Sequence, residues 1–235
     1  IRTYVDLRAI LHSRFKVLVD VMHGAANGHM EQLVKGGRCR IETLHAEPDP
    51  LFGGHAPEPI PSHLQELAKA VRQRRWDVGL ATDGDADRLG VIGSNGAFIT
   101  PGQVLCILLN HLMASRKWKG AVVKTVSNTS MIDRMTQELG LRLVEVPVGF
   151  KHIAKLMLQD DILIGGEESG GIGIRGYLPE RDGILMGLLV LEAMVLQGRG
   201  LLDILRRLER RFGRWFYARR DLTITPNEVP RLFER

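Results

Sequence analysis

Short apolar runs alternate with segments of helical periodicity along most of this 235-residue chain. The apolar runs are rich in Val, Ile and Leu and too short for typical helices, which favours strands. Alternation of strands and helices is typical of sheets that contain parallel strands and are covered by helices. We therefore expect an α/β protein with two consecutive α/β/α units, each built on a mixed, mostly parallel sheet. The expected strands are residues 15–21, 39–44, 78–81, 89–92, 97–99, 121–125, 141–146, 162–165 and 215–223.

A helix-start signal separates the two expected units. Thr100 can cap a helix, Pro101 suits the first helical position, and Gln103 can complete a capping box. The expected domains are residues 1–99, residues 100–213, and a strand and linker over residues 214–235. Later helices are expected at residues 131–139, 149–158, 182–197 and 200–212.

The composition is typical of a soluble globular protein. Hydrophobic residues make up 44% of the chain and charged residues 25%. Cys39 and Cys106 lie far apart in apolar surroundings, which favours a reducing, cytoplasmic location. Eight arginines lie within residues 199–220, but a helix there would carry them on its solvated face, so we expect no nucleic-acid partner. No apolar run reaches membrane length, and we expect no membrane association.

Three aspartates, Asp83, Asp85 and Asp87, follow the apolar run Val78–Ala81. Alternate residues of an extended segment project to the same side, so the three carboxylates should crowd together. Carboxylates that close repel one another, and a cation would offset their charge. Mg²⁺ prefers oxygen ligands of this kind, and the neighbouring Arg88 can meet phosphate oxygens. The sequence therefore predicts a Mg²⁺ site at these aspartates.

Three other interpretations of the aspartates compete with a Mg²⁺ site. An EF-hand loop needs Gly and Glu where this chain has Arg88 and Ser94, so a calcium loop is excluded. A strand followed by Asp-x-Asp also resembles the haloacid dehalogenase-like phosphatases, in which the first aspartate, here Asp83, is the nucleophile. Those enzymes have Thr or Val at the position of Asp87. Surface aspartates without a ligand remain a third, less economical interpretation, because three aligned carboxylates are rarely free.

Further polar residues follow other expected strands. By strand alternation Glu167 and Ser169 share one side of a glycine-rich stretch and could bind sugar hydroxyls. Lys151 opens the helix expected at residues 149–158 and could hold a phosphate or, with a lowered pKa, move protons. Lys124, at another strand end, could do the same. Taken alone, each stretch is also compatible with a simple turn or a solvent-facing side chain.

Together these segments resemble the α-D-phosphohexomutase family, which includes phosphoglucomutases and phosphomannomutases. Asp83–Arg88 is similar to the metal loop of the family, and Gly166–Gly171 is similar to its sugar-binding loop. The resemblance runs in the family's order over nearly the whole chain. Four more segments carry it: Ala46–Gly54 with the following Pro57–Pro59, Lys124–Ser127, Pro147–Lys151 and Leu178–Gly183.

The resemblance implies an enzyme of four domains, of which residues 1–99 would be most of domain 2 and residues 100–213 domain 3. Residues 214–235 would lead to domain 4. It implies that Asp83, Asp85 and Asp87 hold Mg²⁺ and that Arg88 has a catalytic position against phosphate. Glu167 and Ser169 would grip sugar hydroxyls. Lys124 and Lys151 would lie on the substrate side, with Lys151 the better candidate for acid–base catalysis.

The resemblance also implies the reaction. A phosphoserine in domain 1 donates its phosphoryl group to a hexose monophosphate, and the resulting hexose 1,6-bisphosphate reorients and returns its other phosphate. No segment here resembles the serine loop or domain 4, so we expect the chain to need the missing domains 1 and 4 and to be inactive alone. The Glu-Glu-Ser-Gly-Gly motif favours glucose over glucosamine and leaves mannose open. The alternatives are a haloacid dehalogenase-like phosphatase and a non-catalytic sugar-phosphate binding module.

Overall fold

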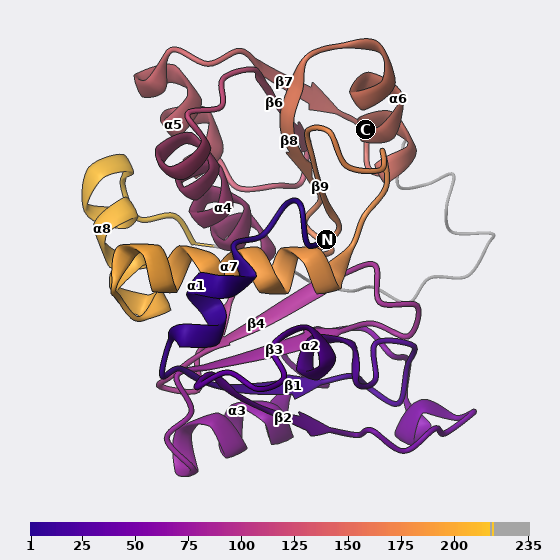
Figure 1. The fold of residues 1–235 in the computed structure, drawn as a ribbon. Coiled ribbons are helices and arrows are strands. Elements are labelled where there is room, and N and C mark those ends of the chain that lie inside the picture. Colours follow the sequence, from indigo (N-terminus) through magenta and orange to yellow (C-terminus); the bar gives the residue numbers. More distant parts are fainter. Residues whose placement is uncertain (217, 219–235) are drawn as a thin grey trace, which may run out of the picture.

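The computed structural model describes residues 1–216 and 218. Two mixed sheets lie on either side of a layer of helices (Figure 1). The strand orders are β2-β1-β3-β4-β5 in the first sheet and β7-β6-β8-β9 in the second. In each sheet the first three strands of the chain are parallel, and the next strand returns antiparallel. The expected α/β class with two mixed, helix-covered sheets is therefore confirmed.

The first sheet is built from residues 16–99. Its strands are β1 (Lys16–Asp20), β2 (Arg40–Leu44), β3 (Val78–Thr82), β4 (Leu89–Gly93) and β5 (Phe98–Ile99). Helices α1 (Leu7–His12), α2 (His29–Leu33) and α3 (Gln65–Gln73) accompany it, with a short 3₁₀ helix at Phe52–Gly54. Every residue of β3 and β4 is buried, because both faces of these central strands are covered. Leu67 and Val71 of α3 pack against Leu18 and Ile92 on one of those faces.

The second sheet is built from residues 121–174. Its strands are β6 (Ala121–Thr125), β7 (Leu143–Val146), β8 (Ile162–Gly166) and β9 (Ile172–Ile174). Its helices are α4 (Pro101–Arg116), α5 (Met131–Leu139), α6 (Phe150–Gln159), α7 (Gly183–Gln197) and α8 (Leu201–Phe212). The predicted capping box at the start of α4 is confirmed. Thr100 Oγ1 accepts the Gln103 N–H at 3.3 Å, and Gln103 Oε1 accepts the Thr100 N–H at 2.9 Å.

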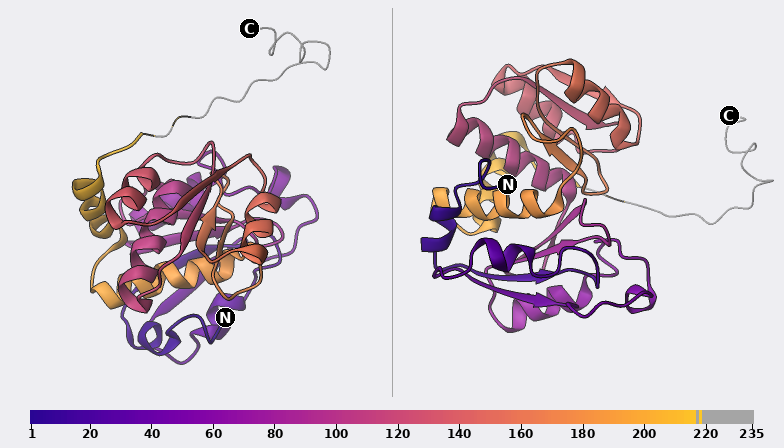
Figure 2. Two further views of the ribbon diagram at one scale, coloured as in Figure 1. Left: turned by 90° about the horizontal axis from the view of Figure 1, so that it is seen from above. Right: turned by 45° about the vertical axis from the view of Figure 1, so that its right-hand side comes forward.

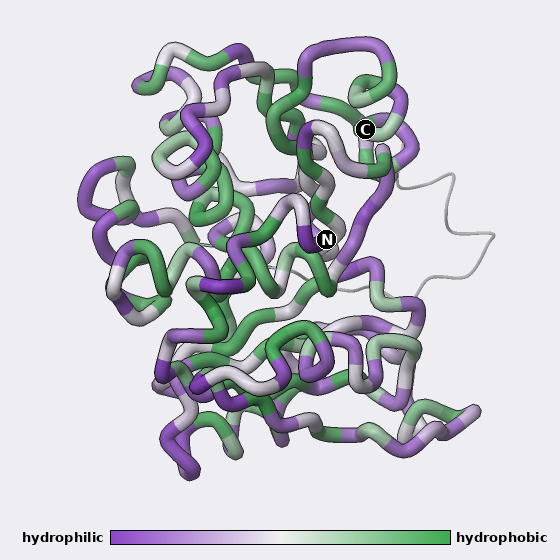
Figure 3. Tube along the Cα trace, in the orientation of Figure 1, coloured by the Kyte–Doolittle hydropathy of each residue, from purple (hydrophilic) through white to green (hydrophobic). Residues whose placement is uncertain are grey.

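Helix α7 lies between the two sheets (Figures 1 and 2). It packs against α1, α2, β3 and β4 of the first unit as well as α4 and α8 of the second. Its sequence is apolar almost all round, which Figure 3 shows as a green helix in the middle of the molecule. One apolar core consequently includes Val19 and Leu80 of the first sheet and Leu163 of the second. The two units share this layer, so a boundary near residue 100 does not divide the core.

A buried ionic cluster joins helices of this shared layer. Glu192 of α7 is fully buried, and its carboxylate binds Arg116 Nη2 at 2.6 and 2.9 Å and His111 Nε2 at 3.1 Å. The Asp6 N–H, which precedes α1, donates to the same carboxylate at 3.2 Å. Arg116 also donates to the Tyr4 carbonyl at 2.9 Å. The cluster therefore fixes α1 against α4 and α7.

The expected strand at residues 215–223 falls mostly outside the described residues, and its described members are Trp215, Phe216 and Ala218, which are not in a strand. Within residues 1–216 and 218, no single helix is long and apolar enough to span a membrane. Helices α7 and α8 reach that length only when taken together, across a bend of 81°.

Candidate active site

The predicted aspartate cluster forms in the loop between β3 and β4. Ligand atoms of Asp83, Asp85 and Asp87 all lie within 4.8 Å of one another, and no other such group of three occurs in the described part of the chain. The backbone that brings the carboxylates together is not the expected extended strand, because β3 ends at Thr82 and the chain then turns. Asp83 Oδ1 accepts the backbone N–H groups of Asp87 and Arg88, each at 2.9 Å. This turn gathers the carboxylates that strand alternation was expected to gather.

The electrostatics of this loop favour a cation. Burial raises the pKa of Asp87 to about 7, and repulsion from Asp83 adds to the shift. Asp83 is buried, Asp87 is partly buried and Asp85 is exposed. The donor set is all carboxylate oxygen, which suits a hard ion such as Mg²⁺. The residues therefore fit the predicted metal, and one ion would offset the repulsion.

Arg88 is held in place by two carboxylates. Its Nε donates to Asp83 Oδ2 at 2.6 Å, and its Nη1 lies 3.4 Å from Glu58 Oε1. Burial alone would lower the pKa of Arg88, but the hydrogen bond and charge of Asp83 outweigh burial and raise it. The Pro- and Gly-rich loop that carries Glu58 also supports the aspartate loop, because the Pro57 carbonyl accepts the Gly84 N–H at 3.3 Å. Arg88 is thus a fixed cation beside the carboxylates.

The second predicted loop begins where β8 ends. Glu167 is buried, and its Oε1 accepts the Gly149 N–H at 3.1 Å. Burial raises the pKa of Glu167, and the charge of Arg181 opposes the shift. Because β8 ends at Gly166 and the chain then turns, alternation does not continue through this loop. Glu168 and Ser169, rather than Glu167, line the neighbouring cavity.

Arg181 connects the two loops and was not singled out from the sequence. Its Nη2 forms an ion pair with Asp87 Oδ2, and its Nη1 lies 3.6 Å from Glu167 Oε2. The guanidinium also lies 5.6 Å from the centre of the Phe150 ring. The sequence feature that could have pointed to Arg181 is the segment Leu178–Gly183, which resembles the family, but that resemblance assigned no role to the arginine.

The backbones of the two loops are also joined. Arg88 and Gly171 form an isolated antiparallel bridge, and the Leu89 N–H donates to the Gly170 carbonyl at 3.1 Å. The Gly183 N–H, at the start of α7, donates to the Ala86 carbonyl at 2.9 Å. A Cβ at Gly183 would lie only 2.5 Å from the Arg88 carbonyl oxygen, so the approach requires glycine. The loops are therefore placed together by backbone contacts as well as by charge.

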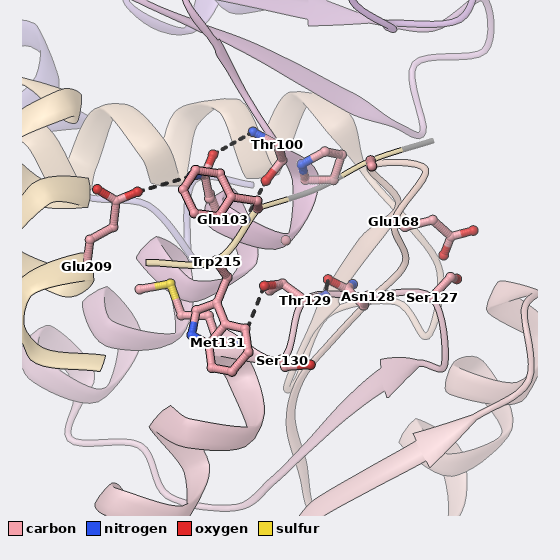
Figure 4. Close-up of a pocket in the computed structure, with 14 residues that line it drawn as sticks. Thr100, Gln103, Ser127, Asn128, Thr129, Ser130, Met131, Glu168, Glu209 and Trp215 are labelled. Carbon is pink, nitrogen blue, oxygen red and sulfur yellow. Dashed lines mark hydrogen bonds between the residues drawn. The ribbon is translucent and has the colours of Figure 1, made fainter. Parts of the chain in front are cut away.

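Both loops open on a cavity of about 800 Å³ between the two units. Its polar lining includes Glu58, Arg88, Ser127, Glu168 and Ser169. Thr125 Oγ1, at the end of β6, donates to Glu168 Oε2 at 2.8 Å. An adjoining pocket of about 240 Å³ shares Ser127 and Glu168 and reaches the start of α4 (Figure 4). The cavity is large enough for a sugar phosphate and places hydroxyl, carboxylate and guanidinium groups around it.

Family models match both units. Residues 100–212 match the model described as "Phosphoglucomutase/phosphomannomutase, alpha/beta/alpha domain III", and residues 1–96 match that for alpha/beta/alpha domain II. The chain belongs to the phosphoglucomutase/phosphomannomutase family. The resemblance drawn from the sequence motifs is thereby confirmed.

Relatives in this family carry several substrate names. Phosphoglucomutase 1 of Drosophila melanogaster is 31% identical over 212 residues, which cover 88% of this chain and 38% of that protein. A probable phosphoglucosamine mutase of Methanothermobacter thermautotrophicus is 34% identical over 185 residues, covering 78% of this chain and 39% of the relative. The crystal structure of a putative phosphomannomutase from Thermus thermophilus matches with a TM-score of 0.84 and 38% identity, over 90% of this chain and 49% of that one. This chain therefore spans less than half the length of each.

The two predicted lysines of this phosphohexomutase chain occupy different surroundings. Lys151 is exposed near the start of α6, two residues after Gly149, whose N–H binds Glu167. Lys124 is only 3% exposed, and its Nζ lies 2.6 Å from Asp133 Oδ2 and 3.3 Å from Glu145 Oε2. Its ammonium group is therefore occupied by carboxylates of α5 and β7. The structure brings the aspartates, Arg88 and the sugar loop together and does not place Lys124 among them.

Proposed function

We propose that this chain is the central part of a Mg²⁺-dependent hexose-phosphate mutase that interconverts hexose 1-phosphate and hexose 6-phosphate. One observation carries the proposal. The acidic loop at Asp83–Arg88 and the sugar loop at Gly166–Gly171 are joined by Arg181 and by the Arg88–Gly171 bridge, and Arg88 of the first loop and Ser169 of the second line one cavity. A site with a cation-binding end and a hydroxyl-binding end suits a phosphorylated sugar.

The acidic end would serve phosphoryl transfer. Asp83, Asp85 and Asp87 would hold Mg²⁺, which neutralises negative charge on a transferring phosphoryl group. Arg88 adds a second positive charge, and its Nε–H is already committed to Asp83. The remaining guanidinium N–H groups face Glu58 and the cavity, from which they can donate to phosphate oxygens. Arg88 therefore orients phosphate without having to reorganise.

The other end of the cavity would bind the sugar. Ser169 lines the cavity directly and can donate or accept a hydrogen bond with a sugar hydroxyl. Glu167 would reach a hydroxyl by exchanging its longer contact, 3.6 Å to Arg181, while Oε1 keeps the Gly149 N–H. Lys151, in the first turn of the helix that this glycine precedes, would serve as the acid–base group. Lys124 stays a predicted substrate contact, although its ion pairs favour a structural role.

The full reaction would need parts of the parent enzyme outside residues 1–235. A phosphoserine would donate the phosphoryl group, and hexose 1,6-bisphosphate would be the intermediate that turns over in the cavity. Domains 1 and 4 are accordingly the proposed partners of this chain, which alone would be inactive. Glucose is the favoured sugar, and mannose is the second candidate. A cytoplasmic location would suit such an enzyme.

The geometry of Asp83 argues against the haloacid dehalogenase-like alternative. A nucleophilic carboxylate must present a free oxygen to phosphorus. Asp83 is 1% exposed, Oδ1 accepts two backbone N–H groups, and Oδ2 accepts the Arg88 Nε–H. An aspartate held in this way is suited to shaping the loop and binding a cation.

The proposal is tested by assaying the full-length parent enzyme and residues 1–235 side by side. Glucose 1-phosphate, mannose 1-phosphate and glucosamine 1-phosphate would each be supplied with catalytic glucose 1,6-bisphosphate, with Mg²⁺ or with a chelator. We expect Mg²⁺-dependent conversion of glucose 1-phosphate by the parent and none by residues 1–235. Turnover by residues 1–235 alone, or a parent that does not act on any hexose phosphate, would contradict the proposal.

A further inference from the structure

Four of the eight histidines in the chain surround one small cavity on the first unit. The cavity measures about 200 Å³ and is lined by His23, His45, His55 and His63 together with Asp20 and Glu66. The rings form two pairs, with centroids 5.0 Å apart for His23 and His45 and 4.8 Å apart for His55 and His63. The proposed mutase reaction uses none of these side chains.

Three of these histidines share one hydrogen-bonding pattern, in which Nδ1 lies next to a backbone carbonyl. Nδ1 of His23 lies 2.7 Å from the Glu47 carbonyl, Nδ1 of His63 lies 3.0 Å from the Glu58 carbonyl, and Nδ1 of His55 lies 3.4 Å from the Ala56 carbonyl. A carbonyl oxygen can only accept, so each Nδ1 must carry the proton. In the neutral ring the lone pair is then on Nε2. Metal-binding histidines are fixed in the same way, with one ring N–H donated to a carbonyl or carboxylate.

Gly53 keeps the space between two of these nitrogens open. A Cβ built on it would lie 3.3 Å from His23 Nε2 and 3.9 Å from His55 Nε2, so both atoms approach one point. Gly53 has a φ of +71°, which requires glycine for its backbone as well. His23 and His45 also have positive φ values, of 59° and 51°, an uncommon conformation for residues with a side chain. The local backbone thus holds imidazole rings toward a common space.

We propose that this cavity binds a divalent transition-metal ion of the Zn²⁺ class through the Nε2 atoms of His23, His55 and His63. Neutral imidazole suits Zn²⁺, Ni²⁺ and Cu²⁺, whereas the all-carboxylate loop at Asp83–Asp87 suits Mg²⁺. The three nitrogens do not all lie within 4.8 Å of one another, so binding requires at least one ring to rotate. His55 is exposed and has the longest hydrogen bond of the three, which makes its ring the one to move. His45 is held at the cavity wall by Asp20 at 2.9 Å and Glu66 at 3.4 Å.

The proposal is tested by titrating Zn²⁺ into untagged, chelator-treated residues 1–235 and measuring binding by calorimetry. The variants are His23→Asn, which tolerates a positive φ, and His63→Gln. His29→Ala is the matched control, because His29 also bonds a carbonyl through Nδ1, at 3.1 Å to Asn27, but lies outside the cavity. Asp85→Asn tests whether Zn²⁺ binds the acidic loop instead.

We expect one Zn²⁺ per chain, with a Kd that rises at least tenfold in His23→Asn and His63→Gln and changes little in His29→Ala and Asp85→Asn. Acylation of histidines followed by mass spectrometry provides a readout independent of variant folding. Zn²⁺ should protect His23, His55 and His63 but not His29. No binding, binding lost only in Asp85→Asn, or equal acylation of all four histidines with and without Zn²⁺ would overturn the proposal.

Discussion

The backbone of Gly171 pairs with that of Arg88, and this contact places a loop of the second sheet directly against the acidic loop of the first. Arg181 spans the same junction through its ion pairs with Asp87 and Glu167. The two loops are far apart in sequence and belong to different sheets. Their joint position follows from the shared helix layer, because α7 begins at Gly183 beneath the Ala86 carbonyl.

Replacing Gly183 with alanine should loosen this junction. The new Cβ would lie 2.5 Å from the Arg88 carbonyl oxygen and 3.0 Å from that of Ala86, so backbone must move. We expect a loss of about 1–3 kcal/mol in the free energy of unfolding, measured by urea denaturation. Gly200→Ala is the control, because a Cβ there meets no atom closer than 4.0 Å. Equal stability of Gly183→Ala and wild type would show that the approach is not constrained.

Glu58→Gln should weaken the positioning of Arg88. Glu58 Oε1 is 3.4 Å from Arg88 Nη1, and the loss of its charge leaves Asp83 as the main anchor of the guanidinium. We expect kcat/KM of the parent enzyme to fall by about 10-fold, as is common when a supporting contact of a site residue is removed. Glu47→Gln changes an exposed residue of the same loop and should leave the rate unchanged. Equal rates in both variants would mean that Glu58 does not position Arg88.

Lys124→Met distinguishes a structural lysine from a substrate contact. Its ammonium group binds Asp133 and Glu145, and hydrogen bonds to charged groups contribute about 1.5–3 kcal/mol. We expect a loss of that size in the free energy of unfolding of residues 1–235, with KM of the parent enzyme unchanged. A raised KM at unchanged stability would instead support the substrate role implied by the family resemblance.

Glu192 should make the protein sensitive to acid. Burial alone would raise the pKa of Glu192, but hydrogen bonds from His111 and Arg116 outweigh burial and lower it. A carboxyl with a lowered folded pKa adds stability above its unfolded pKa of about 4.3, and this stability is lost as the pH falls through the folded pKa. We expect wild type to lose stability below about pH 4.3.

Glu192→Gln tests this account of the acid sensitivity. At pH 7 it should cost about 3–5 kcal/mol, because Arg116 loses its buried partner, and the remaining loss in acid should be smaller than in wild type. Asp203→Asn is the control, because the Asp203 side chain lies on the exposed face of α8. Denaturant titrations at pH 7 and at about pH 3 check both points, and an unchanged acid slope in Glu192→Gln would refute the assignment to Glu192.

The sequence predicted those structural features that depend only on residues close together in the chain. The capping box of Thr100 and Gln103 is formed within one turn, so its residues suffice to predict it. The clustering of the three aspartates was also predicted, although a turn held by Asp83 produces it in place of an extended strand. Strand alternation did not predict the orientations of Glu167 and Ser169, because β8 ends at Gly166 and the chain turns there too.

Features that depend on contacts between distant segments were not predictable in this way. Arg181 reaches both Asp87 and Glu167 only because α7 and the two loops meet in space. Helix α7 likewise packs against both units, and this position depends on residues of each unit that are distant in sequence. The burial of Lys124 could have been predicted from the sequence. Successive side chains of a strand point to opposite faces, so Lys124 shares the face of Val122, which belongs to the core between the sheets, and not that of Val123.

The most direct test of the account is a mutase assay of the parent enzyme with one substitution in each loop. Asp85→Asn removes a predicted Mg²⁺ ligand without disturbing the hydrogen bonds of Asp83, and Ser169→Ala removes a hydroxyl of the sugar loop from the cavity wall. If the loops form one site, both variants should lose glucose 1-phosphate turnover, by about 10²–10³-fold for Asp85→Asn, and excess Mg²⁺ should partly restore only that variant. Turnover at the wild-type rate in both variants would contradict the account.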